Sequence, residues 1–109
     1  MRQVARVIAE AFKAGRCASC GNTRTDGYVV YLHGNPIVRR IGKKTQISLA
    51  GYPTATTRSR INDTMCVLGI EFHLFQAHGE QWISGTDYAG LRFEISMPET
   101  GWVDVEWGV

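Results

Sequence analysis

The sequence of 109 residues has little cysteine, little proline and no long hydrophobic run. Its three cysteines, Cys17, Cys20 and Cys66, are too few, and odd in number, for the disulfide framework of a small secreted protein. No apolar stretch approaches the ~20 residues that a membrane helix needs. Residues 1–15 alternate charged and apolar side chains, unlike the continuous apolar core of a signal peptide. We therefore expect a cytosolic protein with reduced thiols and no membrane partner.

The remaining composition is that of an ordinary globular chain. Hydrophobic residues make up 44% of the sequence, and we find no repeat or low-complexity segment in it. A chain of this length builds one hydrophobic core and can fold without disulfides or metal. We expect residues 1–109 to form a single domain that needs no cofactor.

Charge is distributed unevenly along the chain, although the net formal charge is only +2. Residues 1–60 contain eleven of the Lys and Arg residues and only two carboxylates, which gives a formal charge of +9. Residues 61–109 contain one Arg and eight carboxylates, which gives −7. Such asymmetry predicts separate basic and acidic surfaces, unless folding brings the two halves together and interleaves their charges. The sequence leaves both arrangements open.

The first half of the chain predicts one helix followed by a three-stranded meander. Apolar residues at helical spacing predict an amphipathic helix over residues 2–14. Residues 16–27 are small, polar and punctuated by glycine, which predicts a loop. Runs rich in β-branched and aromatic residues predict three strands: 28–33, 37–41 and 45–50. A two-residue turn at Gly34-Asn35 and a second turn over 42–44 would join these strands.

The second half predicts another helix and two pairs of strands. Thr54, Thr56 or Thr57 can cap a helix that runs to about Leu68. Alternating and β-rich runs predict four further strands: 70–75, 81–84, 91–97 and 102–107. A short turn joins the last two, which should form a C-terminal hairpin at a sheet edge. The fold class is therefore α+β: a mostly antiparallel sheet of order α-βββ-α-ββ-ββ, with two helices packed on it.

Basic residues surround the predicted turn over 42–44 and the start of the second helix. An arginine near a helix N-terminus opposes the helix dipole at a cost of about 0.3–1 kcal/mol, which a phosphate or an acidic partner would offset. Tyr28, Tyr31 and Tyr52 lie nearby in the sequence and can stack on bases. We interpret one basic set as a candidate nucleic-acid or anion site: Arg39, Arg40, Lys43, Lys44, Arg58, Arg60 and Asn62.

Tryptophan and carboxylates occur together near the C-terminus. Tryptophan is enriched at the centres of protein interfaces, and an edge hairpin can pair with another chain. An acidic surface can also occupy the basic channel of a nucleic-acid-handling complex. We interpret one set as a candidate protein-binding surface: Glu94, Glu99, Trp102, Asp104, Glu106 and Trp107.

Metal and catalytic motifs are weak. Cys17 and Cys20 have the spacing of a zinc or redox pair, but a structural zinc site needs four ligands and the sequence has no second such pair. His33, His73 and His78 do not follow a known ligand spacing. We therefore expect no metal, with Cys17 and Cys20 as the candidate ligands if there is one. No catalytic motif stands out, although catalytic residues can converge only in the fold.

Three segments carry a resemblance: GNTRTDG at 21–27, YLHGNPI at 31–37 and GYPTATTRSRIN at 51–62. Together they resemble a scattered family of small proteins encoded by tailed bacteriophages and prophages. The resemblance covers about residues 10–75. It implies a phage accessory protein made in the cytoplasm of the bacterial host, and it brings no activity and no catalytic residues.

Turn and cap chemistry accounts for most of the residues in these segments. Arg58, Arg60, Asn62 and His33 are not accounted for in this way, and we expect a shared polar site among them if the family has one.

These observations favour a non-enzymatic phage accessory protein that binds a host protein or nucleoprotein complex, for example an inhibitor of a CRISPR effector. The first alternative is a small nucleic-acid-binding protein that uses the basic set. The second is an enzyme or a metal protein built around Cys17 and Cys20. The sequence does not indicate an oligomeric state.

Overall fold

The computed structural model describes residues 3–86 and 89–105, which form two helices and nine strands. The helices are α1 (Gln3–Lys13) and α2 (Ala55–Leu68). The strands are β1 (Ala18–Cys20), β2 (Thr23–Thr25), β3 (Val29–Leu32), β4 (Asn35–Ile41), β5 (Lys44–Ile47), β6 (Phe72–Ala77), β7 (Glu80–Thr86), β8 (Arg92–Ser96) and β9 (Val103–Asp104). All strand pairs are antiparallel, so the predicted α+β class is confirmed.

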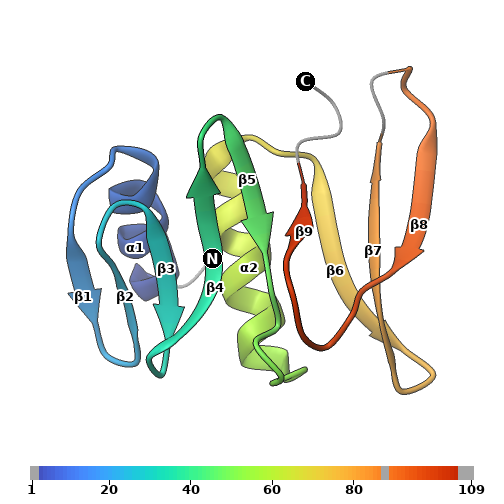
Figure 1. Cartoon of the computed structure of the whole chain (residues 1–109), viewed down its shortest axis with the longest axis horizontal. Helices are drawn as coiled ribbons and strands as arrows, with labels where there is room; N and C mark the ends of the chain where they lie inside the picture. The colour runs from blue at the N-terminus through green and yellow to red at the C-terminus, as the bar shows by residue number, and fades with distance from the viewer. Residues whose placement is uncertain (1–2, 87–88, 106–109) are drawn as a thin grey trace.

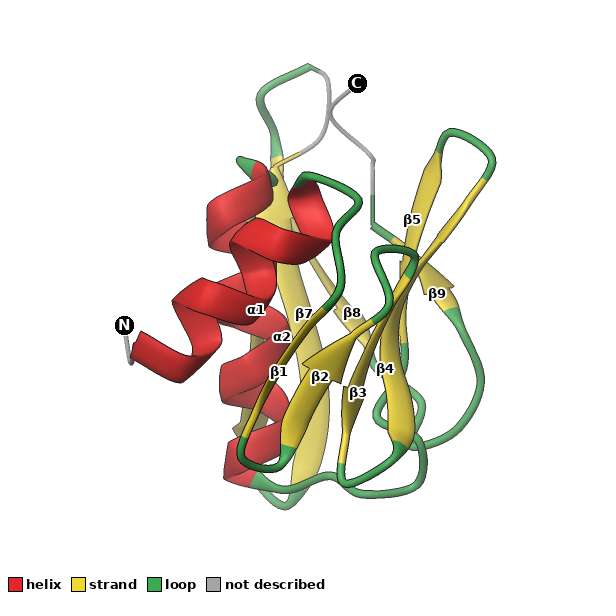
Figure 2. Ribbon diagram, turned by 90° about the vertical axis from the view of Figure 1, so that its left-hand side faces the viewer, coloured by secondary structure: helices red, strands yellow, loops and turns green. Residues whose placement is uncertain are grey.

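The strands form two sheets that meet at α2 (Figure 1). Sheet A has six strands in the order β1-β2-β3-β4-β5-β9, and sheet B has three in the order β6-β7-β8. Both helices lie on the same side of sheet A (Figure 2). The opposite side of sheet A, which we call its outward face, is turned toward the viewer in Figure 1 and carries no other element of the described chain.

The hydrophobic core draws on both helices and both sheets. Phe12 of α1, Val38 of β4, Met65 of α2 and Ile83 of β7 are all completely buried within one cluster. Side chains alternate between the faces of a strand, so the buried residues of sheet A face the helices, whereas Arg24, Arg39 and Gln46 face outward. Each large apolar side chain buried in this way contributes about 1.5–3 kcal/mol relative to an exposed one.

Helix α2 begins and ends at local signals. The hydroxyl oxygen of Thr54 accepts a hydrogen bond from the backbone N–H of Thr57, which makes Thr54 the N-cap among the three threonines considered. Gly69 adopts the left-handed conformation at the C-terminus, where its N–H donates to the carbonyl of Cys66. No helix among residues 3–86 and 89–105 combines the length and apolarity that crossing a membrane requires.

Two predictions for the first half are wrong. Residues 16–27 form β1 and β2 rather than a loop, since three-residue strands are too short to give a periodic signal. The β3–β4 turn consists of His33 and Gly34, one residue earlier than predicted. Both have positive φ, 52° and 80°, as the right-handed twist of a tight hairpin favours, and Asn35 instead pairs with Leu32.

The predicted C-terminal hairpin is also wrong. β9 does not pair with β8 but crosses to sheet A, where Asp104 lies opposite Gln46 and Val103 opposite Ile47. This arrangement buries Val105 against the core and supplies hydrogen-bond partners to the edge of β5, which a β8–β9 hairpin would leave open. β9 still lies at a sheet edge, as expected, but at the edge of sheet A.

Candidate nucleic-acid interface

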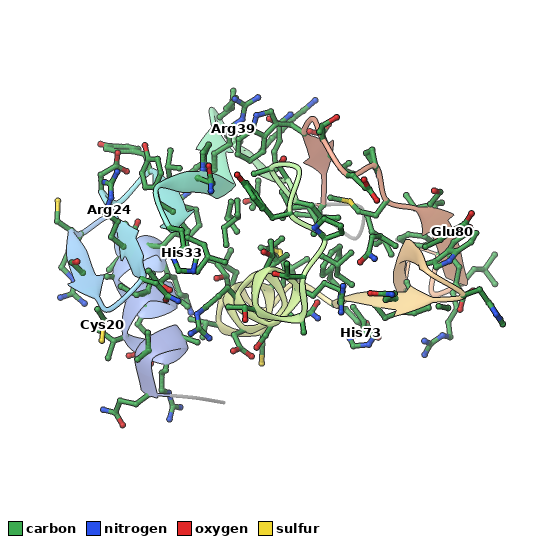
Figure 3. The ribbon with its side chains drawn as sticks, turned by 90° about the horizontal axis from the view of Figure 1, so that it is seen from below. Cys20, Arg24, His33, Arg39, His73 and Glu80 are labelled. Carbon is green, nitrogen blue, oxygen red and sulfur yellow. The ribbon has the colours of Figure 1, made fainter. Side chains whose placement is uncertain are left out.

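Two arginines on the outward face of sheet A are stacked on aromatic rings. Arg24 of β2 lies over the ring of Tyr31 of β3, with 4.1 Å between the guanidinium carbon and the ring centroid. Arg39 of β4 lies over the ring of Trp102, just before β9, also at 4.1 Å. Figure 3 shows Arg24 and Arg39 on the side of sheet A that faces away from the helices. The four side chains thus display two flat cationic stacks on one face.

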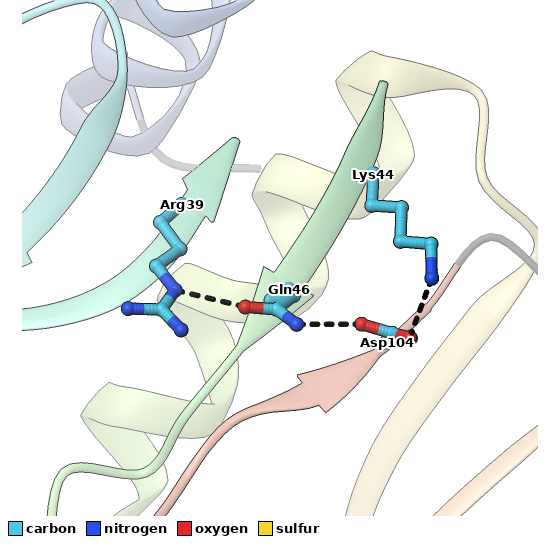
Figure 4. A network of polar contacts seen from close by, with 4 residues as sticks. All are labelled: Arg39, Lys44, Gln46 and Asp104. Carbon is cyan, nitrogen blue, oxygen red and sulfur yellow. Dashed lines mark hydrogen bonds and ion pairs between the residues drawn. The ribbon is translucent and has the colours of Figure 1, made fainter. Parts of the chain in front are cut away.

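A row of polar contacts crosses the same face from β4 to β9 (Figure 4). Arg39 Nε donates to Gln46 Oε1 at 2.9 Å, and Gln46 Nε2 donates to Asp104 Oδ1 at 2.7 Å. Lys44 Nζ lies 3.7 Å from the other oxygen, Oδ2, of the same carboxylate. The register explains the row, because Gln46 lies opposite Arg39 on one side and Asp104 on the other.

The loop between β2 and β3 brings another exposed aromatic to the end of sheet A. The Asp26 carboxylate accepts hydrogen bonds from the backbone N–H groups of Tyr28 and Val29, each at 2.9 Å. The bond from Tyr28 is the main reason that the pKa of Asp26 lies below its ordinary value. The side chain of Tyr28 is 65% exposed.

The structure divides the predicted basic set into two groups. Arg39 and Lys44 lie on the outward face, and Lys43 is exposed in the adjoining β4–β5 turn. Arg40 points the other way, toward α1. Its guanidinium lies 4.7 Å from the ring centroid of Phe12 and donates to the carbonyl oxygen of that residue at 3.1 Å. Arg40 therefore joins α1 to sheet A and does not extend the cationic face.

The other members of the basic set connect α2 to the sheets. Arg58 Nη1 donates to Gln81 Oε1 of β7 at 2.9 Å, and Arg60 Nε donates to Thr23 Oγ1 of β2 at 3.2 Å. The Asn62 side chain donates to the carbonyl of Leu74 and accepts from its N–H, at 2.9 and 2.8 Å. These contacts offset the cost of placing arginine near the helix N-terminus without any external anion.

The predicted acidic set does not form one surface. Trp102 and Asp104 lie among the cations of sheet A, whereas Glu94 is exposed on β8 of sheet B. Glu99 precedes β9 in the connecting loop, where its carbonyl oxygen accepts from the N–H of Gly51. Glu106 and Trp107 lie outside the described residues. At the β5–β9 pair, therefore, the basic and acidic halves of the sequence interleave.

The cysteines and histidines do not come together. Cys17 Sγ lies at the surface, 3.7 Å from the carbonyl oxygen of Asp26, whereas Cys20 packs against the core. His73 stacks on Phe75 of sheet B, with ring centroids 5.6 Å apart. Within the described ranges, no three His, Cys, Asp or Glu side chains are grouped to hold a metal ion.

A pocket of about 470 Å³ lies at the opposite end of α2 from Gly69. Leu32, Ile37 and Leu49 line it, and His33 and Tyr52 contribute polar groups to its wall. His33 Nε2 also lies 3.4 Å from Asn22 Nδ2. Residues of the segments 31–37 and 51–62 thus line the pocket, and the segment 21–27 reaches it only through the contact of Asn22 with His33. The lining of the pocket carries no Lys, Arg, Asp or Glu, so it does not extend the cationic face.

The sequence does not predict the pairing of Arg24 with Tyr31, although Tyr31 is among the tyrosines that can stack on bases. The two residues come together only because β2 pairs with β3, and β2 falls in the segment that was expected to be a loop. Alternation of Thr23 and Thr25 with Arg24 was the available signal, but three residues are too few to establish it.

Fold and surface together define a small α+β protein with two separate antiparallel sheets and a cationic, aromatic face on the larger one. Residues 1–100 match the family model described as Kyanoviridae Gp96 protein. The chain belongs to this family and is a bacteriophage protein, as the resemblance implied. No curated protein and no solved structure matches it significantly.

Proposed function

We propose that this phage protein is a non-enzymatic accessory protein that binds single-stranded nucleic acid in the infected host, on the outward face of sheet A. The observation that carries the proposal is the pair of arginine–aromatic stacks on that uncovered face, Arg24 on Tyr31 and Arg39 on Trp102. Arg39, Lys43 and Lys44, which the sequence placed in the basic set, lie on this face or at its end.

The chemistry of the face suits an unpaired strand. Bases of a single strand stack on aromatic rings and guanidinium planes, at about 1–3 kcal/mol per base, and cations along the path hold the phosphates. The bases of a duplex are already stacked on one another and present only their edges, which flat stacks do not read. Binding should therefore favour single strands over duplexes.

A host protein, such as a basic complex of antiviral defence, is the second candidate partner. The surface that supports it is the outer face of sheet B, where Phe75 and Trp82 are cross-strand partners and only partly buried. The exposed carboxylates of Glu80 and Glu94 lie on the same face by register. This surface needs no residue of sheet A, so the two candidates are separable by mutation.

Fluorescence anisotropy with labelled single-stranded DNA and RNA at low salt tests the first candidate. We expect saturable binding that weakens as salt rises, since phosphate contacts release counterions, and weaker binding to a duplex of the same length. Absence of binding to either single strand at low salt would exclude the proposal, and capture of a stoichiometric host protein would then favour the second.

A further inference from the structure

The carboxylate of Asp104 fills an anion site formed by the protein itself. Gln46 Nε2 donates to one carboxylate oxygen at 2.7 Å, and Lys44 Nζ lies 3.7 Å from the other. Lys44 and Gln46 are two residues apart on β5 and so share the outward face. An ammonium and an amide N–H directed at one pair of oxygens are the groups that bind a phosphate in many proteins.

Arg39 fixes the orientation of this site. Its Nε–H donates to Gln46 Oε1 at 2.9 Å, which turns the amide so that Nε2 points toward Asp104. The same arginine lies over Trp102, two residues before Asp104 and on the same face of the chain. A stacking position for a base and a site for an anion therefore lie close together on one face, and one nucleotide carries both a base and a phosphate.

We propose, on the basis of the function proposed above, that Lys44 and Gln46 form a backbone-phosphate subsite and that Asp104 occupies it as an internal competitor. A phosphate of the bound strand replaces the carboxylate at Lys44 Nζ and Gln46 Nε2. The Asp104 side chain then rotates out toward the solvent. The negative charge of the carboxylate at the site is replaced by the negative charge of the phosphate. In the free protein the carboxylate lowers the affinity of the face for nucleic acid.

The exchange requires only a side-chain rotation. The side chain of Asp104 is 47% exposed, so water can solvate the released carboxylate. β9 itself stays in place, because Val105 is only 1% exposed and its N–H donates to the carbonyl of Thr45 at 3.1 Å. The aromatic stack on Trp102 is thus preserved while the phosphate enters.

The variant Asp104→Asn tests the proposal, with Glu94→Gln as its matched control. Both substitutions remove one carboxylate, but Glu94 lies on sheet B, and at physiological salt its charge is screened beyond about 8 Å. We expect Asp104→Asn to bind labelled single-stranded oligothymidylate about two- to fivefold more tightly than the unaltered protein. The phosphate then no longer has to displace the exposed ion pair between Lys44 and Asp104. The slope of log affinity against log salt should stay nearly the same, because a phosphate occupies the subsite in both proteins and the number of phosphate contacts, each worth about 0.7 on a single strand, does not change.

Other outcomes separate this inference from the function on which it rests. If Asp104→Asn binds no more tightly than the unaltered protein or the Glu94→Gln variant does, the phosphate subsite is wrong and the proposed function stands. If neither the unaltered protein nor Asp104→Asn binds any single strand, the proposed function fails first. A second measurement needs no variant: titration with the oligonucleotide should shift the side-chain amide resonances of Gln46, and unmoved resonances in a binding protein would overturn the subsite.

Discussion

Arg60 and Thr23 are 37 residues apart in the sequence, yet Arg60 Nε of α2 donates a hydrogen bond to Thr23 Oγ1 of β2 at 3.2 Å. The same threonine hydroxyl donates to Asn22 Oδ1 at 2.9 Å. Arg60 is only 7% exposed, so its guanidinium lies inside the fold and not on a binding surface. The contact separates the arginines that hold the fold together from those that are available to a ligand.

Replacing Arg60 should therefore affect stability and leave nucleic-acid binding intact. We expect Arg60→Met to lower the free energy of unfolding by about 1–3 kcal/mol, because it removes a charge-assisted hydrogen bond to a buried hydroxyl. Arg39→Ala, at the surface, should cost less, about 0.5–1 kcal/mol, the value of an exposed stack such as that of Arg39 on Trp102. Urea denaturation of both variants measures the difference. A larger loss for Arg39 than for Arg60 would contradict this division.

Replacing Arg39 or Trp102 should weaken binding to single strands. Each alanine variant loses one stacking position, and we expect about a tenfold lower affinity, within the 1–3 kcal/mol per stacked base. Arg39→Ala should also reduce the salt slope by about 0.7, whereas Trp102→Ala should leave it unchanged, because tryptophan carries no charge. Arg92→Ala on β8 is the charge-matched control. Equal losses at Arg39 and Arg92 would mean that net charge, and not the outward face, governs binding.

Only glycine should be tolerated at position 27, because the loop between β2 and β3 lies very close to the end of α1 there. Gly27 has φ of 94°, and a Cβ atom there would lie 2.6 Å from the carbonyl oxygen of Gly15. We expect Gly27→Ala to cost about 3 kcal/mol of stability, from backbone strain together with overlap against the main chain. Gly34→Ala is the control, since its φ is 80° with nothing near the added methyl group, and about 1 kcal/mol is expected. Equal costs in thermal or urea denaturation would contradict the steric argument.

The charge of Asp26 should contribute to stability only above acidic pH. Because the N–H of Tyr28 lowers the pKa of Asp26 in the folded protein, its ionised form is favoured by folding. This contribution is complete above the ordinary pKa near 3.8 and disappears as the pH falls through the lowered folded-state pKa. Asp26→Asn keeps an acceptor oxygen and removes the charge, so its stability deficit should be constant at neutral pH and vanish in acid. A deficit that persists below both pKa values would show that charge is not its cause.

Local signals in the sequence predicted the elements that depend on local chemistry. Thr54 and Gly69 mark the two ends of α2, because a hydroxyl cap and a left-handed glycine act within one helical turn. β1, β2 and β9 contain three residues or fewer, and pairing rather than periodicity creates them. The strand with which β9 pairs depends on where Val105 can be buried against apolar side chains, and no local sequence pattern specifies that.

The candidate site was predicted in part for the same reason. Arg39 and Lys44 were identified in the basic set and Trp102 in the acidic set, since Trp102 is more than fifty residues away from both cations in the sequence. Arg58 and Arg60 were grouped with them on charge alone. Their partners, Gln81 and Thr23, are known only once both sheets are packed on α2.

The side chain of Asn62 pairs with both backbone groups of Leu74, while Arg58 and Arg60, on the same helix, bond to β7 and β2. Helix α2 is thus the common anchor of two sheets that belong to separate ladders. If α2 separates from either sheet, the polar groups of that sheet lose their hydrogen-bond partners on the helix. The two sheets should consequently unfold in a single cooperative transition. A partner that binds either sheet would therefore protect both sheets from proteolysis.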